Sequence, residues 1–408
     1  MSALVAGTKA LHLSRRSQMI GAMLPASSSI RPLIGALILC ACASRAGAQG
    51  LERGKVIDGV QCAADAAQTY ALYLPSNYSP EKKWGVLLAF HPMARGRLMA
   101  EKFQAAAEQY GYIVAASNNS RNGPVAISAA AAEAMGTDVR RRFSVDPQRV
   151  YLTGMSGGAR VAMAIALAGN NIAGVIASSA GYPDSQPRAK VSFAVFGTAG
   201  TEDFNYLEMR LLDRELVSPH FLAVFRGGHG LPPDDIAFNA LEWMTLQAMQ
   251  SGRLTRDDAV VGRILEKRRA AIAASTEPAA TVYLLRALVA DFKGLRDVPA
   301  EASRLEALSG QPEVRKAIRR ERDADNTEAR MLRDLFGLEA ALGDEEHRSV
   351  ALLTLRDRLS NLSRQATGDG DTPERSLARR VLHAVTFGAA GRVQDQEYLT
   401  LLEKYRLQ

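Results

Sequence analysis

The stretch RVYLTGMSGG, from Arg149 to Gly158, predicts the fold class of the sequence around it. It begins as an apolar, β-rich run typical of a buried strand, and the Ala-rich residues Gly157–Ala168 that follow are typical of a helix. Between them, a G-x-S-x-G pattern predicts a tight strand–turn–helix that lifts the hydroxyl of Ser156 above a sheet at a helix N-terminus. Gly154 and Gly158 supply the small neighbours that this turn needs. An ordinary glycine-rich turn is the alternative interpretation.

Short strand-like and helix-like segments alternate on both sides of this stretch. Further strands are expected at 69–74, 84–90, 112–116, 174–178, 191–196 and 221–225, and helices at 99–110, 125–142, 205–216 and 233–249. Strands that alternate with helices of this length predict an α/β fold with a mostly parallel sheet. Because functional side chains in such sheets gather at the carboxyl ends of the strands, the residues that follow each strand are the site candidates.

The loop after the strand expected at 191–196 carries the candidate acid. A serine nucleophile needs a histidine base, and the histidine needs an acid that orients it and stabilises its charged form. Asp203 is the best-placed carboxylate, with its neighbour Glu202 and the earlier Asp184 as alternatives. Asp203 could instead cap the helix expected at 205–216.

The loop after the strand expected at 221–225 carries the candidate base. His229 lies between glycines that let a loop histidine reach the serine. His91 is its rival, because it follows a strand at the same end of the sheet, and a solvated loop histidine is the alternative interpretation. The chain order Ser156, Asp203, His229 is the one that accompanies a G-x-S-x-G elbow.

Two backbone N–H groups are needed to hold a developing oxyanion. One is expected from Gly157, directly after the nucleophile. The other is expected from Met93, in the loop after the strand at 84–90, because Pro92 in the same loop has no N–H to donate.

Three more residues at this end of the sheet are candidates for substrate binding, namely His91, Asn118 and Asn119. Asx-turns or hydrogen bonds between loops would explain the two asparagines equally well. The sequence contains no HExxH, CxxC, P-loop or GxGxxG pattern. Since acyl transfer through a serine requires neither a metal nor an organic cofactor, none is expected.

Residues 69–250 resemble the α/β-hydrolase fold, and within it the esterases akin to polyhydroxybutyrate depolymerases and feruloyl esterases. The matching pieces are YALYLPSNY at 70–78, GMSGG at 154–158, GTAGTED at 197–203 and GGH at 227–229. SNNSRNG at 117–123 and EDFNY at 202–206 are similar to a less characterised bacterial branch. The resemblance implies a serine hydrolase that acts on a small-molecule or polymer ester, with Ser156 as nucleophile, His229 as base and Asp203 as acid.

Residues 1–48 are predicted to be a leader. They carry five basic residues and no acid, and a short apolar run at 32–43 precedes Ala46-Gly47-Ala48. This pattern indicates a secretory signal peptide cleaved after Ala48, and therefore a periplasmic or extracellular protein. The apolar run is too short for a bilayer span, which needs about 20 residues. A lipid-attachment box around Cys40 and a buried N-terminal helix are the alternatives.

The charge of the sequence follows from this leader. The net charge is +7, from 50 Lys and Arg against 43 Asp and Glu, and five of the basic residues precede residue 49. The remaining chain is nearly neutral, which argues against a nucleic-acid partner. Cleavage would also remove Cys40 and Cys42, so no internal disulfide is expected. The remaining Cys62 is interpreted as a half-buried loop residue.

Residues 251–408 are predicted to form an all-α module behind a hydrolase domain at 49–250. Helices are expected near 256–274, 277–292, 299–307, 311–322, 326–342, 345–366, 372–386 and 393–406. Their lengths resemble antiparallel pairs of the tetratricopeptide kind, although no 34-residue repeat recurs. Such a module could dock a protein partner or cover the active-site mouth.

Two functions from different classes fit these observations. The first is a secreted serine esterase, which the G-x-S-x-G elbow and its partners favour. The second is a non-catalytic scaffold, in which a decayed hydrolase domain presents the helical module to a partner. The proline in the loop after 84–90 and the size of the helical appendage keep the second hypothesis open.

Overall fold

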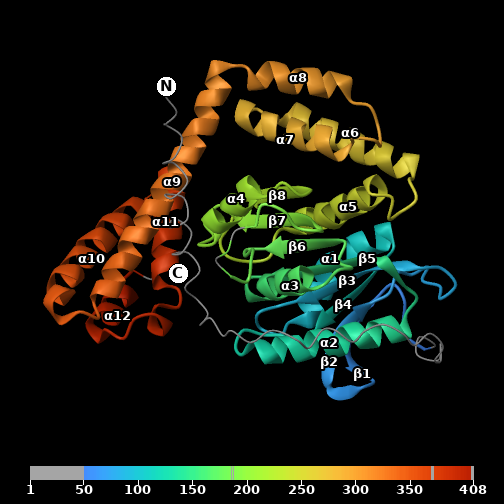
Figure 1. Ribbon diagram of the computed structural model, residues 1–408, viewed down its shortest axis with the longest axis horizontal. Coiled ribbons are helices and arrows are strands. Elements are labelled where there is room, and N and C mark those ends of the chain that lie inside the picture. The colour runs from blue at the N-terminus through green and yellow to red at the C-terminus, as the bar shows by residue number, and fades with distance from the viewer. Residues whose placement is uncertain (1–49, 185, 187, 369–371, 406–408) are drawn as a thin grey trace, which may run out of the picture.

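An eight-stranded sheet lies at the centre of the protein (Figure 1). The computed structural model describes residues 50–184, 186, 188–368 and 372–405, so the predicted leader at 1–48 lies outside the described residues. The strands are β1 (Val56–Cys62), β2 (Asp65–Tyr73), β3 (Trp84–Phe90), β4 (Tyr112–Ser117), β5 (Val145–Met155), β6 (Gly174–Ser178), β7 (Ala194–Gly200) and β8 (His220–Phe225). Their order is β1-β2-β4-β3-β5-β6-β7-β8. Pairings β1–β2 and β2–β4 are antiparallel and all the others are parallel, which confirms the α/β fold class.

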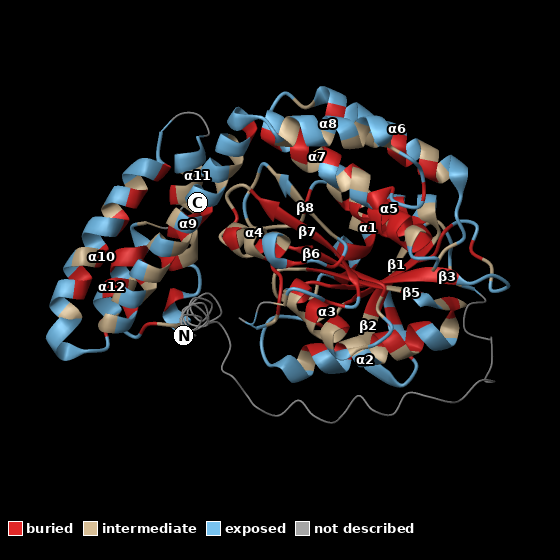
Figure 2. Cartoon of the chain, turned by 45° about the horizontal axis from the view of Figure 1, so that its top comes forward, coloured by how far each residue is buried: buried red, intermediate tan, exposed pale blue. Residues whose placement is uncertain are grey.

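Helices cover both faces of this sheet. They are α1 (Gly96–Tyr110), α2 (Val125–Arg142), α3 (Gly157–Ala168), α4 (Tyr206–Glu215) and α5 (Asp234–Gln250). Helices α1 and α5 pack on one face through Phe103 and Trp243, and the other three pack on the opposite face through Met135, Ala162 and Met209. Every residue of β3, β4, β6 and β7 is buried, as expected for strands with helices on both sides (Figure 2).

Only helices follow α5 in the described residues. They are α6 (Asp258–Ala274), α7 (Pro278–Asp291), α8 (Pro299–Ser309), α9 (Pro312–Ala341), α10 (Glu345–Ala366), α11 (Pro373–Thr386), a 3₁₀ turn (Ala389–Gly391) and α12 (Gln396–Glu403). N-cap side chains mark several starts: Asp257, Asp344, Thr372 and Asp395 each accept a hydrogen bond from a first-turn N–H.

The helical module packs on the sheet domain at two places. Helices α6 and α7 cover the end of α5, where Leu246 joins a cluster with Val261 and Leu285. Helix α9 then leads to α10–α12, whose core includes Leu207 of α4 (Figure 1). Both contacts bury apolar side chains, so the module is stabilised against the sheet domain by the hydrophobic effect.

Five expectations from the sequence need correction. Residues 56–62 form a strand, and Cys62 is its buried last residue, where burial raises the pKa of the thiol to about 11. The strand expected at 191–196 is Ala194–Gly200, and the strand expected to begin at Arg149 extends from Val145 to Met155. The two helices expected at 311–322 and 326–342 are one continuous helix, α9. The helix expected at 393–406 is the shorter α12, preceded by a 3₁₀ turn.

No helix in the described ranges is both long and apolar enough to cross a membrane.

Candidate active site

Ser156 lies at the junction between β5 and α3, in a strained turn. Its φ is +52°, a left-handed value that is costly for a residue with a Cβ, and its N–H donates to the carbonyl of Ser178 at 2.8 Å. A Cβ on Gly154 would lie 2.2 Å from the carbonyl oxygen of Gly158, and a Cβ on Gly158 would lie 2.2 Å from that of Phe90. The two glycines therefore let α3 turn back tightly over the ends of β5 and β3.

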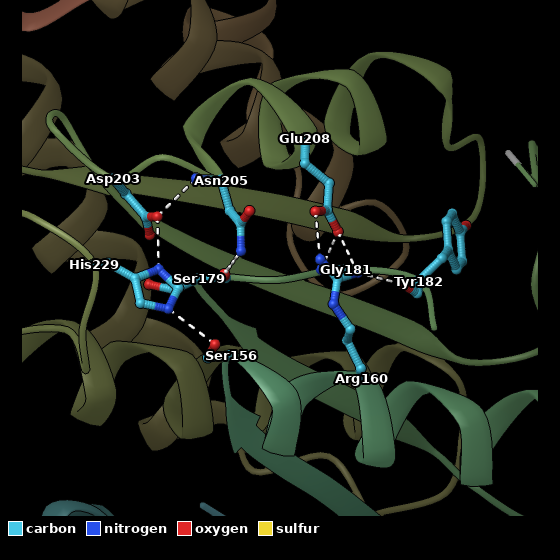
Figure 3. Close-up of polar contacts among 9 residues, drawn as sticks. All are labelled: Ser156, Arg160, Ser179, Gly181, Tyr182, Asp203, Asn205, Glu208 and His229. Atoms are coloured by element: carbon cyan, nitrogen blue, oxygen red, sulfur yellow. Dashed lines mark hydrogen bonds and ion pairs between the residues drawn. The ribbon is translucent and has the colours of Figure 1, made fainter. Parts of the chain in front are cut away.

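Three side chains from three strand ends form one chain of hydrogen bonds (Figure 3). Nε2 of His229 lies 2.9 Å from Oγ of Ser156, and its Nδ1 lies 2.8 Å from Oδ1 of Asp203. Asp203 is fully buried, whereas His229 is partly exposed. A serine hydroxyl, a histidine ring and a buried carboxylate in this order can remove a proton from the hydroxyl and hold the resulting imidazolium.

The loops that carry the acid and the base are joined through their backbones. The N–H of Thr201 donates to the carbonyl of Phe225 at 2.8 Å, and the N–H of Glu202 donates to that of Gly227 at 2.8 Å. A Cβ on Gly200 would lie 2.3 Å from the Gly227 oxygen, so only glycine lets the two loops approach this closely. This pairing fixes the separation between Asp203 and His229.

The alternative acids and the alternative base have other partners. Glu202 forms an ion pair with Arg379 of α11, and Asp184 forms an exposed one with Arg188. His91 is buried at the end of β3, where burial and the nearby Arg95 lower the pKa of its ring. The structure thus brings Asp203 and His229, rather than these alternatives, to Ser156.

The two expected oxyanion donors differ in their hydrogen bonds. Gly157 is the first residue of α3, where a backbone N–H has no acceptor within the helix. The N–H of Met93 donates to Nδ1 of His91 at 3.1 Å, so it is already used within its own loop. That loop is held by a bridge between Met93 and Arg121 and by a 2.9 Å bond from the N–H of Asn122 to the carbonyl of Pro92. The donor role of Met93 stays a prediction.

Asn118 and Asn119 use their side chains to fix the loop after β4. The amide of Asn118 donates to Asp58 at 2.9 Å. Asn119 accepts from the N–H of Thr69 at 2.8 Å and donates to the carbonyl of Ala67 at 3.0 Å. These partners lie in β1 and β2, so the bonds favour a structural role, in which the two asparagines tie the loop to neighbouring strands.

Residues that sequence reasoning missed bind the loops that carry Asp203 and His229 (Figure 3). Ser179, with a φ of +60°, donates through Oγ to the carbonyl of Gly230, directly after His229, at 2.9 Å. Asn205 donates from its side chain to the carbonyl of Ser179 at 2.7 Å and from its backbone to Oδ1 of Asp203 at 2.8 Å. The signal that could have found Ser179 is its place after β6, at the same end of the sheet as Ser156.

Asn122 is a further missed residue, and it touches the elbow. Its side chain lies so close to Gly157 that a Cβ there would be 1.8 Å from the Asn122 Oδ1. The amide therefore covers the N-terminus of α3, next to the expected oxyanion position. The SNNSRNG segment contained this residue, but nothing in its spacing distinguished Asn122 from the two asparagines before it.

A second polar cluster joins α3 to α4 beside the triad (Figure 3). Arg160 forms a two-pronged ion pair with Glu208, at 2.9 and 2.7 Å, and Glu208 also accepts from the N–H of Gly181 at 2.8 Å. Because bidentate pairs of this kind restrict geometry, the cluster holds the loop after β6 against α3 and α4. Within the described chain, no group of three or more His, Cys, Asp or Glu side chains is placed to hold a metal ion.

Comparison with known proteins gives structural likenesses only. No protein-family model matches the chain, and no curated protein matches it. Esterase 2 of Thermogutta terrifontis, phosphorylated by paraoxon, is 18% identical over 50% of this chain and 96% of its own, with a TM-score of 0.38. An esterase of Pyrobaculum calidifontis is 9% identical over 48% and 86%, with a TM-score of 0.39. FphF, a fluorophosphonate-binding serine hydrolase of Staphylococcus aureus, is 14% identical over 47% and 97%, with a TM-score of 0.36.

The fold itself defines the class. A mostly parallel eight-stranded sheet carries Ser156 on a strained elbow after β5, Asp203 after β7 and His229 after β8. This arrangement is that of an α/β-hydrolase, as the resemblance in the sequence implied. The narrower likeness to polyhydroxybutyrate depolymerases and feruloyl esterases stays a prediction.

Proposed function

We propose that the protein is a serine hydrolase that cleaves carboxylic esters through an acyl-enzyme on Ser156. The observation that supports this most is the continuous hydrogen-bond chain from Oγ of Ser156 through His229 to the buried Asp203. An ordinary glycine-rich turn would require neither the strained φ of Ser156 nor a histidine on its hydroxyl.

The first half of the proposed reaction forms the acyl-enzyme. Oγ of Ser156 attacks the ester carbonyl carbon while Nε2 of His229 takes the hydroxyl proton. Asp203 keeps the ring oriented and stabilises its positive charge. The N–H of Gly157 stabilises the oxyanion, and the proposed second donor is the N–H of Met93, once it has exchanged His91 for the substrate oxygen. The carbon–oxygen bond to the alcohol then breaks, and His229 gives its proton to the departing oxygen.

The second half releases the acid. Water takes the place of the alcohol, loses a proton to His229 and attacks the acyl carbon. The bond to Oγ of Ser156 breaks, and the same proton returns to the serine. The net reaction is one ester and one water to one carboxylic acid and one alcohol, with the residues restored.

A fluorophosphonate probe tests this proposal, because it phosphonylates only an activated serine. We expect covalent labelling of the full chain at Ser156, loss of labelling in Ser156→Ala, and hydrolysis of p-nitrophenyl esters by the wild type. Absence of both labelling and hydrolysis would contradict the proposal and favour the non-catalytic scaffold. Esters of rising acyl length, compared with feruloyl and acetyl-xylan substrates, would then define the substrate.

We also propose that the protein is exported, on the basis of the basic flank, the short apolar run and Ala46-Gly47-Ala48. The expected mature N-terminus is Gln49. N-terminal sequencing of the protein recovered from a fractionated bacterial host checks this. Retention of the full leader in the cytoplasm would contradict export, and a lipid-modified Cys40 would indicate anchoring.

A further inference from the structure

An aromatic side chain from the helical module reaches the proposed base. The ring of Phe387, directly after α11, lies 4.5 Å from that of Phe204, centroid to centroid, in a stacked arrangement. Phe204 in turn stacks on His229 at 4.0 Å, and Phe387 itself is 6.2 Å from the His229 ring. Nearly half of Phe387, 47%, is exposed, so it presents a free apolar surface beside the imidazole.

Phe387 is held in this position by its own module. Its N–H closes the end of α11 by donating to the carbonyl of His383 at 2.8 Å, and its carbonyl accepts from Arg392 at 2.6 Å. Arg392 is also paired with the buried Glu339, at 3.3 Å. Gly388, with a φ of +66°, then turns the chain sharply away. The exposed ring is therefore a fixed feature of the fold.

The module also holds the loop that carries the proposed acid. Arg380 of α11 donates to the carbonyl of Thr201 at 2.7 Å, and Arg379 pairs with Glu202. Together with the Phe204–Phe387 stack, these contacts mean that residues on both sides of Asp203 touch the C-terminal helices. The helical module thus forms part of the wall of the site.

The proposed mechanism indicates which part of an ester would contact Phe387 and Phe204. During acylation His229 gives its proton to the departing alcohol, so the alcohol portion lies on the His229 side of the scissile bond. An aromatic or bulky apolar alcohol would cover the exposed ring of Phe387 and gain contact area that a short alkyl alcohol lacks. The sheet domain supplies Phe204 to this surface, and the helical module supplies Phe387.

We propose that Phe387 and Phe204 form the binding surface for the alcohol portion of the substrate, and that this surface selects aromatic or bulky apolar alcohols. This inference rests on the proposed ester hydrolysis. It assigns to the C-terminal module a direct part in specificity.

Two acetates of similar leaving-group basicity test this role, ethyl acetate and benzyl acetate. They share one acyl-enzyme, so a difference between them in kcat/KM arises before the alcohol leaves. In full-length Phe387→Ala we expect kcat/KM for benzyl acetate to fall roughly 3- to 10-fold and that for ethyl acetate to change less than about 2-fold. Phe387→Leu should retain part of the preference, because it keeps apolar bulk.

The matched control is Leu353→Ala, which truncates another exposed apolar residue of the module, on α10. It should change neither ester. Titration with a fluorophosphonate counts intact sites, so a poorly folded variant is corrected for. An equal loss for both esters, or no loss for either, would overturn the subsite while leaving the hydrolase intact. A wild type that neither labels nor hydrolyses either ester would overturn the proposed function, and the subsite with it.

Discussion

The carboxylates of Glu202 and Asp203 are neighbours in the sequence but serve different parts of the molecule. Asp203 is buried and lies 2.8 Å from Nδ1 of His229, whereas Glu202 pairs with Arg379 of the helical module. The backbone bond from Glu202 to Gly227 keeps the two side chains divided in this way. A single loop thus orients the proposed base and also attaches the C-terminal helices.

This division predicts opposite outcomes for two matched amide substitutions. Asp203→Asn removes the charge that orients the His229 ring and stabilises the imidazolium, so kcat should fall by about 10³- to 10⁴-fold. Glu202→Gln removes only an ion pair on the far side of the loop, so kcat should stay within about 3-fold of the wild type. Steady-state hydrolysis of a p-nitrophenyl ester measures both, and the reverse ranking would show that the acid has been misassigned.

The elbow glycines give a second prediction, on stability. The added methyl of Gly154→Ala would lie 2.2 Å from the Gly158 carbonyl, so the turn must open, at a cost of at least about 2 kcal/mol and with loss of activity. Gly337→Ala is the control. Gly337 lies within α9, and a Cβ added there would have no neighbouring atom within 4 Å. It should stabilise the helix by about 0.5–1 kcal/mol. Urea unfolding measures both free energies, and equal effects would contradict the steric argument.

Local patterns made the parallel sheet predictable, and with it the strand ends at which Ser156, Asp203 and His229 lie. Buried strands such as 84–90 are continuous apolar runs, and the elbow is marked by its glycines, so the strand ends and the residues after them could be found. The edge strand β1 was missed because only two of its seven residues are buried and it lacks such a run. The sequence predicts separate helices at 311–322 and 326–342, yet Arg322 and Asp323 continue the exposed face of α9, and the buried Asp325 pairs with Arg214 of α4.

Contacts between distant segments could not be predicted. Nothing near Phe204 indicates that Phe387 stacks on it, and nothing near Glu202 indicates Arg379 as its partner. These pairs depend on where α9 places the last helices, which is set by packing rather than by local sequence. For the same reason the sequence left the role of the module undecided between a docking surface and a cover for the site.

A buried ion pair within the module gives a third prediction. Arg380 donates to Glu328 from Nε at 3.0 Å, and both side chains are buried. Arg380→Met would leave the Glu328 carboxylate buried without this partner, which should destabilise the protein by about 3–5 kcal/mol. Burial raises the pKa of Glu328 and Arg380 opposes that rise, so the loss should shrink as acid protonates the carboxyl.

Two further variants serve as controls for Arg380→Met. Arg380→Met combined with Glu328→Leu should recover most of the stability, because no charge then remains buried. Arg356→Met removes an exposed ion pair, 3.7 Å from Glu397, and should cost less than about 1 kcal/mol. Denaturant unfolding at neutral pH compares the three variants. A double variant as unstable as the single one would contradict the buried-charge explanation.

The contact between α5 and α7 gives a fourth prediction, on pH. Asp291 is buried and accepts from Trp243 and Gln247, both at 2.9 Å, and burial raises its pKa to about 6. The folded chain therefore holds a proton on Asp291 that the unfolded chain has already released. Between about pH 4 and pH 6 this group should make stability fall as the pH rises.

Asp291→Asn removes that titration. The stability of the variant relative to the wild type should therefore improve from pH 4.5 to pH 7.5. Trp243 donates directly to Asp291, so its fluorescence should titrate in the wild type with a midpoint near pH 6. The variant should lack both this fluorescence titration and the fall in stability that Asp291 causes between about pH 4 and pH 6. Parallel stability curves for the two proteins would contradict the raised pKa.

The three asparagines of the loop after β4 give the last prediction. Asn119→Ala would leave the N–H of Thr69 and the carbonyl of Ala67 without their partner, at a cost of about 1–3 kcal/mol. Asn122→Ala would instead remove the amide that lies against Gly157 and should lower kcat about 10-fold with little change in stability. Thermal unfolding and ester hydrolysis measured on both variants check this separation. If Asn119→Ala impaired kcat and Asn122→Ala did not, the first interpretation of Asn119 as a substrate-binding residue would be restored.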